Sequence, residues 1–342
     1  MSGFTVGLAI LGGLVLAVLV AWNAWTTRRN TPLQPDAPQP AAAAGSDEPA
    51  QRTEPVLEAE MAPLPMPERK PGLDSLIDAI CPIVVDHVVT GEAALAALPP
   101  TRRAGSKPFA IEGFNDAAQA WETPRAGQRY NRFQSGVQLA NRNGPLNEIE
   151  FSEFVVKTQA FADAIGGAPE FPEMLDAVNR ARELDQFASA HDAQLSFTLR
   201  ARNAAWSPGY VQQNAGKHGF VAGAIPGRMV MPSSAAAGSP ILGLAFDTQA
   251  AMADDPAHTA IRELALSLDV THVPRSEQPF VKMRDAAIAL AASMDGLITD
   301  DNGQVIRAEA LDVIGADLEH LYDTLEARDL SAGSPQARRL FS

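Results

Sequence analysis

An uncharged and mostly apolar run, residues 4–25, stands near the start of the chain and is followed closely by Arg28 and Arg29. About 20 residues of α-helix span the roughly 30 Å hydrocarbon core of a bilayer. Backbone groups in lipid must be hydrogen-bonded within the segment, so a spanning segment is a helix. The sequence therefore predicts one transmembrane helix over residues 4–25, which anchors the remaining chain to a membrane.

A cleaved signal peptide is the alternative interpretation of this run. Secretory signals start with basic residues and end at small residues. Here no charged side chain precedes the run, and Trp22 and Trp25 lie at its end. The positive-inside rule places Arg28 and Arg29 on the cytoplasmic side. We therefore expect a single-pass protein with residues 1–3 in the periplasm and the bulk of the chain in the cytoplasm.

The next segment, residues 30–72, is rich in proline, alanine and acidic residues and contains no aromatic residue. Such a composition buries too little apolar surface to offset the entropy of ordering. We expect a disordered linker that acts as an extended leash. Its reach would be on the order of 35 Å as a coil and roughly 130 Å as polyproline II. A plain spacer with no requirement for reach is the alternative.

Charge and cysteine content limit the partners of the body. The formal net charge is -14, and no basic stripe interrupts it, so the sequence predicts no nucleic-acid partner. The single cysteine, Cys81, can form no internal disulfide, which is consistent with a reducing compartment. It lies in an apolar run, where a small buried hydrophobic residue is the expected role.

The body reads as an α/β fold of the α+β type. Two stretches, residues 73–191 and 192–328, each show strand, helix, strands and helix in that order, by hydrophobic periodicity. This order predicts antiparallel sheets built from split βαβ units, and two related modules. The first stretch is either an extension or a diverged duplicate of the second. Residues 329–342 are expected to form a flexible tail.

The second stretch resembles the carboxy-terminal domain of the ZipA family of bacterial cell-division proteins. The clearest match runs through the helix AIALAASMDG, the hairpin LITDDNGQVI and the closing helix, with Pro274 at a strand end. The order of anchor, proline-rich linker and carboxy-terminal α/β domain also agrees with this family. The first stretch, residues 73–191, has no counterpart in the family's short form.

The resemblance implies a non-catalytic tether in the cell inner membrane. In the family, a shallow apolar groove on the helix-free face of the sheet holds the carboxy-terminal tail of FtsZ, and other proteins of the division machinery are compatible as further partners. Asp247 stands where the family has an apolar side chain. For both methionines, the protein core is the alternative location, and a one-residue slip would exchange the faces of the strand ending at Val270. The candidate partner-binding residues are Thr198, Arg200, Met229, Met231, Gly243, Ala245 and Val270.

Catalytic and metal-binding motifs are missing from the sequence. The six histidines are scattered, and we find no HExxH, paired CxxC, GxSxG, P-loop or GxGxxG pattern. Asn302-Gly303 predicts a hairpin turn and not a calcium loop. The sequence therefore predicts no enzyme activity, no cofactor and no metal. The alternative function is a membrane-anchored enzyme or regulator with a ferredoxin-like cytoplasmic body.

Overall fold

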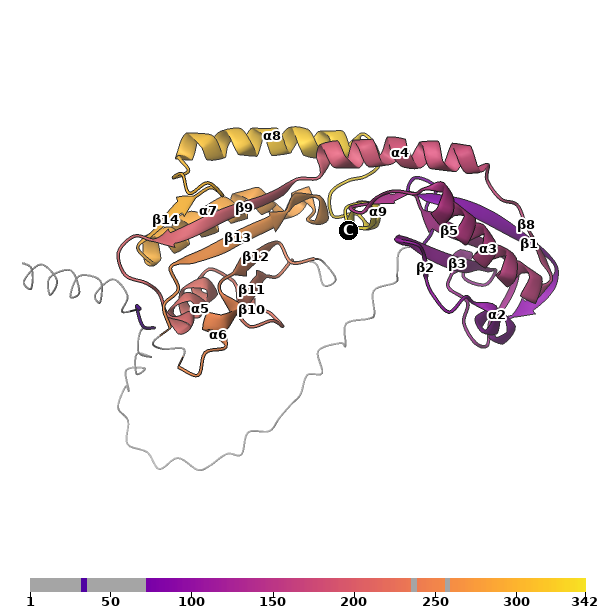
Figure 1. Cartoon of the computed structure of the whole chain (residues 1–342), viewed down its shortest axis with the longest axis horizontal. Helices are drawn as coiled ribbons and strands as arrows, with labels where there is room; N and C mark the ends of the chain where they lie inside the picture. Colours follow the sequence, from indigo (N-terminus) through magenta and orange to yellow (C-terminus); the bar gives the residue numbers. More distant parts are fainter. Residues whose placement is uncertain (1–31, 36–71, 235–238, 256–258) are drawn as a thin grey trace, which may run out of the picture. The chain divides into compact units, whose positions relative to one another are not determined.

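The computed structural model describes residues 32–35, 72–234, 239–255 and 259–342. The predicted periplasmic residues 1–3, the predicted anchor 4–25 and most of the predicted linker 30–72 lie outside these residues. In the part that is described, no helix combines the length and apolar character needed to cross a bilayer. The described elements belong to two compact units, which are considered separately (Figure 1).

The first unit contains one main antiparallel sheet and a two-stranded hairpin of β6 and β7. The main sheet has the strand order β2-β3-β5-β1-β8, and β4 pairs with the last residues of β3. The elements are β1 (Asp78–Thr90), α2 (Gly91–Ala97), β2 (Arg103–Ala104), β3 (Lys107–Asn115), β4 (Ala120–Glu122), β5 (Arg129–Gln138), β6 (Ala140–Asn141), β7 (Gly144–Pro145), α3 (Glu148–Ile165), β8 (Gly167–Pro169) and α4 (Met174–His191).

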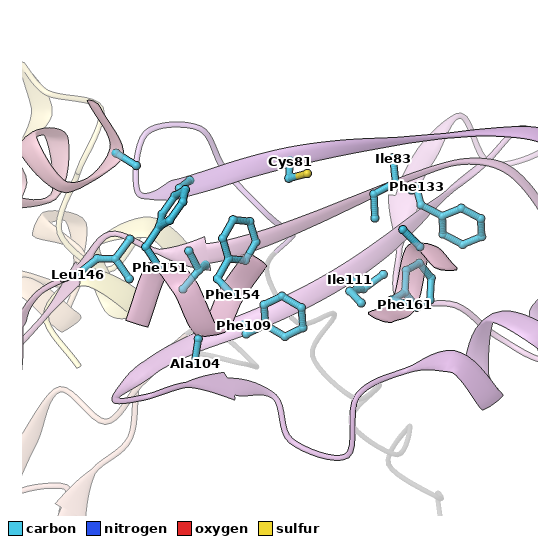
Figure 2. Close-up of a cluster of buried hydrophobic side chains, with 14 of the residues drawn as sticks. Cys81, Ile83, Ala104, Phe109, Ile111, Phe133, Leu146, Phe151, Phe154 and Phe161 are labelled. Atoms are coloured by element: carbon cyan, nitrogen blue, oxygen red, sulfur yellow. The ribbon is translucent and has the colours of Figure 1, made fainter. Parts of the chain in front are cut away.

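Helix α3 shows how local sequence positions the core of this unit. Asn147 caps its first turn, accepting hydrogen bonds from the Ile149 and Glu150 amides, and Gly166 ends it in the left-handed conformation. The apolar stripe of α3 is buried against the sheet. Figure 2 shows Phe154 and Phe161 of α3 in one cluster with sheet residues.

The second unit contains a six-stranded antiparallel sheet with the order β10-β11-β12-β13-β9-β14. Helix α7 packs against β13, β14 and β9. The elements are β9 (Gln194–Ala201), α5 (Pro208–Lys217), β10 (Val221–Ala222), β11 (Arg228–Met231), β12 (Leu242–Ala245), α6 (Thr248–Ala251), β13 (Glu263–Asp269), a 3₁₀ turn at Arg275–Glu277, α7 (Pro279–Ser293), β14 (Gly296–Thr299) and the first half of α8 (Ala308–Glu326). The 3₁₀ turn at Val270–His272 and the second half of α8 belong to the first unit.

The two units share one topology. In the first unit, β1 and β3 are joined through α2 and flank β5, and β5 and β8 are joined through α3 and flank β1. In the second unit, β9, α5, β12, β13, α7 and β14 repeat this arrangement. Each unit is thus two interleaved split βαβ motifs, the ferredoxin-like order. The mixed helix and antiparallel-sheet fold expected from the sequence is confirmed.

The carboxy-terminal end differs from the expected flexible tail over residues 329–342. Residues Pro335–Leu340 form α9, which Ser334 caps, and Leu340 and Phe341 are buried. The Arg339 guanidinium donates to the Asp78 carboxylate of β1 at 2.9 Å. The first unit accordingly includes residues 270–275 and 318–342 besides its contiguous part. The tail is ordered because its last turn is apolar and its arginine pairs with a buried carboxylate far away in sequence.

Candidate functional site

The sheet of the second unit has one apolar face and one face of small and polar side chains. Along β13, Leu264, Leu266 and Leu268 are buried, whereas the residues between them are exposed or half-exposed. Strand β9 alternates in the same way, with buried Phe197 and Leu199. The period of two along a strand places the buried set on the side where α7 packs. We call the opposite side the open face.

Backbone pairing arranges the open face into rows. One row runs across four strands through Val230, Gly243, Ser267 and Ser196. The next row contains Arg228, Ala245, Ala265, Thr198 and Thr299. The central strands therefore contribute only glycine, alanine, serine and threonine to these rows. Because such side chains are short, the backbone of another segment can approach the sheet closely.

A charged pair closes one end of this surface. The Arg200 guanidinium lies 3.3 Å from the Glu263 carboxylate across the β9–β13 ladder, and both side chains are more than half exposed. The turn at Gly303 lies beside Arg200, since a Cβ there would come within 3.0 Å of its guanidinium. An exposed ion pair of this kind contributes about 0–1 kcal/mol to stability. Its charges remain accessible to a partner.

Four of the seven residues proposed from the sequence lie on the open face, namely Thr198, Arg200, Gly243 and Ala245. Gly243 has a specific steric role, because a Cβ there would come within 2.8 Å of the Ser267 hydroxyl. A larger residue at this position would fill the floor of the surface or displace the serine. The placement of these residues is observed, and a binding role for them is a proposal.

The interpretation of Met229, Met231 and Val270 as open-face residues is wrong. Met229 and Met231 pair with Leu244 and Leu242, so they share the apolar face, and Met229 is only 5% exposed. Val270 lies after the end of β13, in a 3₁₀ turn, and is fully buried. Met229, Val230 and Met231 are three consecutive apolar residues, so their own pattern does not fix which of them face inward.

Several open-face residues were missed by the sequence analysis. Val230, Ala265 and Ser267 are the most central of them. The signal for the latter two is the clean alternation of ELALSLD, whose leucines mark the buried face. Val270 follows the leucines at the same period of two. Its assignment to the open face therefore shifts the strand by one residue and places the leucines on that face as well.

Asp247 does not enter the open face, although the family resemblance placed an apolar residue there. Its carboxylate accepts a hydrogen bond from the Gln249 amide at 2.9 Å and caps α6. The charge of Asp247 therefore lies beyond the end of the strand. β12 ends two residues earlier, at Ala245.

A buried carboxylate holds the segment that follows β11. Glu277 accepts hydrogen bonds from the Ser233 hydroxyl at 2.9 Å and the Ser234 amide at 3.0 Å, and pairs with Lys282 at 2.7 Å. The Lys282 ammonium and the two serines lower the pKa of Glu277 to about 2. This cluster ties the segment after β11 to the start of α7.

No group of three or more histidine, cysteine, aspartate or glutamate side chains is placed to hold a metal ion within the described residues. Cys81 is buried, and its burial raises the pKa of the thiol to about 11. The thiol is therefore protonated at neutral pH, in line with its expected role as a small core residue.

The equivalent face in the first unit is partly occupied by the chain itself. Leu73 lies against Gly136 of β5, where a Cβ would come within 2.6 Å of the leucine side chain. The Leu73 amide donates to the Glu112 carboxylate at 3.1 Å, and the Gln134 amide group donates to the same carboxylate at 2.8 Å. This contact is an internal example of an apolar side chain that packs on a small residue of such a sheet.

Comparisons of the chain with models of known protein families and with curated protein sequences found no match.

Proposed function

We propose that the protein is a non-catalytic membrane tether whose second unit binds the carboxy-terminal tail of FtsZ on its open face. The proposal rests on the sequence resemblance to the ZipA family over residues 193–328 and on the two rows of small side chains. It places the anchor in the cell inner membrane and the two units in the cytoplasm. The ferredoxin-like order alone supports no choice of function, because many activities share it.

The open face suits a short apolar peptide for a physical reason. A floor of Gly243, Ala245 and Ala265 has little side-chain volume of its own, so a ligand's large side chains can contact the backbone and exclude water from the sheet. Arg200 and Glu263 at one end supply charge for orientation more than for affinity. No bond is made or broken in this mechanism. The protein acts by holding the polymer's tail near the membrane.

A binding measurement on the complete chain, reconstituted in lipid nanodiscs, tests this proposal. Ala265→Glu places a charge and extra volume in the centre of the open face and should weaken binding of an FtsZ tail peptide by more than about tenfold. Ala316→Glu, on the exposed side of α8, is the matched control and should bind as the unaltered chain does. Equal affinity for both variants, with unchanged melting, would exclude the open face.

A further inference from the structure

Residues 32–35 are described by the structure, in contrast to the disorder expected for the whole segment 30–72, and they pair with the second unit. The Leu33 amide donates to the Ala205 carbonyl at 2.7 Å, and the Ser207 amide donates to the Leu33 carbonyl at 3.0 Å. Leu33 thereby forms a parallel bridge to Trp206. The other edge of Trp206 pairs with Ile261 through two hydrogen bonds of 2.8 Å. Trp206 thus pairs with Leu33 on one side and with Ile261 on the other.

The receiving edge is a fixed part of the second unit. Trp206 is fully buried, and its indole N–H donates to the Met294 carbonyl at 2.7 Å. Pro32 is buried, and Pro35 lies 3.4 Å from the position that a Cβ would take at Gly209. Proline has no amide hydrogen, so both prolines limit the added strand to a single pairing residue. The pairing is therefore short and defined in register.

The far end of the same segment is held by the first unit. The Gly72 carbonyl accepts a hydrogen bond from the Arg339 guanidinium at 3.2 Å. Leu73 follows it on the sheet of that unit, against Gly136. Each end of residues 36–71 is consequently bound to a folded unit.

We propose that the Trp206 edge is the docking surface for the chain's own membrane-proximal segment, residues 32–35. The distance between the body and the membrane is then not set by residues 36–71, which follow the docked segment in the chain. The part of this inference that concerns the membrane rests on the proposed anchor. The leash would be residues 26–32, which reach about 25 Å when fully extended, so the Trp206 edge stays within that reach of the end of the anchor.

Amide hydrogen exchange on the complete chain tests the docking without reference to the membrane. Leu33→Pro removes the donor to Ala205 and should speed exchange at the Ser207 amide by at least about tenfold. The Trp206 amide, which bonds to Ile261, should stay protected and report that the unit remains folded. Leu57→Pro is the matched control and should leave both amides unchanged. Exchange at Ser207 that is equally fast in the unaltered chain would overturn the docking.

Energy transfer in nanodiscs tests the consequence for the leash. A donor dye on Asp285→Cys in α7, with Cys81→Ala, reports the distance to acceptor lipids. Twenty Gly/Ser residues inserted after Gln51 should leave the transfer unchanged. The same insert after Asn30 should lower it, since a coil of this length adds on the order of 25 Å. Equal losses from both inserts would show that residues 36–71 are the leash. Failure of the chain to float with lipid vesicles would refute the anchor and leave the exchange result standing.

Discussion

Neighbouring residues of β11 provide a matched pair that separates core from open face. Met229 pairs with Leu244 on the apolar face, whereas Val230 pairs with Gly243 on the open face. Both are apolar and adjacent in sequence, so the change of either to alanine removes side-chain volume from the same strand. The two variants should nevertheless fail in different assays.

The magnitude follows from burial. Met229 is 5% exposed, and truncation of a buried methionine to alanine costs about 2–5 kcal/mol of stability. For a domain of this size, about 1 kcal/mol corresponds to roughly 4 °C, so Met229→Ala should lower the melting temperature by about 8–20 °C. Val230 is only half-buried, so Val230→Ala should cost about 1 kcal/mol or less.

Differential scanning calorimetry and peptide titration on both variants give the test. Met229→Ala should melt lower while its folded fraction binds an FtsZ tail peptide normally. Val230→Ala should melt nearly as the unaltered chain does and bind the peptide about 5- to 10-fold more weakly, which corresponds to about 1 kcal/mol of lost contact. A larger loss of stability from Val230→Ala than from Met229→Ala would mean that the faces assigned to this sheet are reversed.

Three further predictions concern structure outside the open face. Gly136→Ala should displace Leu73 and lower the melting temperature of the first unit, as measured by calorimetry, because the new methyl group would lie within 2.6 Å of the leucine. Arg339→Ala should destabilise the same unit by about 3–5 kcal/mol in urea unfolding, since it leaves the buried Asp78 carboxylate without its partner; an unchanged midpoint would contradict an ordered tail. The pKa of Glu277 is lowered from 4.5 to about 2, so its contribution is complete above pH 4.5 and is lost as the pH falls towards 2. Glu277→Gln should therefore flatten the dependence of stability on pH in that window, and an identical pH profile for both proteins would exclude this role.

The strongly periodic elements could be predicted from the sequence. The phenylalanine stripe of α3, the alternation of β9 and the turn at Asn302-Gly303 are local patterns, and the structure has the helix, the strand and the turn that they indicate. The repeated order of elements also indicated two related modules. What these patterns could not supply was the phase of β11, because its consecutive apolar residues fit either face.

Two contacts could not be predicted from the sequence, because each is made by a single residue of its segment. Leu33 stands between prolines in a segment whose composition indicates disorder, yet one parallel bridge to Trp206 holds it. The last helix of the chain is short and combines buried apolar residues with two arginines, and Arg339 pairs with Asp78, which is 261 residues away. Neither contact produces a periodic pattern in the sequence, so both segments were expected to be disordered or flexible.

The central claim is that the open face of the second unit binds the FtsZ tail. Alanine-methyl NMR of the complete chain in nanodiscs, titrated with the tail peptide, tests it most directly. We predict that the methyl signals of Ala245 and Ala265 shift with added peptide, while those of Ala286 and Ala287, buried in α7, stay in place. Saturating peptide that shifts neither open-face methyl, or that shifts only methyls of the first unit such as Ala110, would contradict the account.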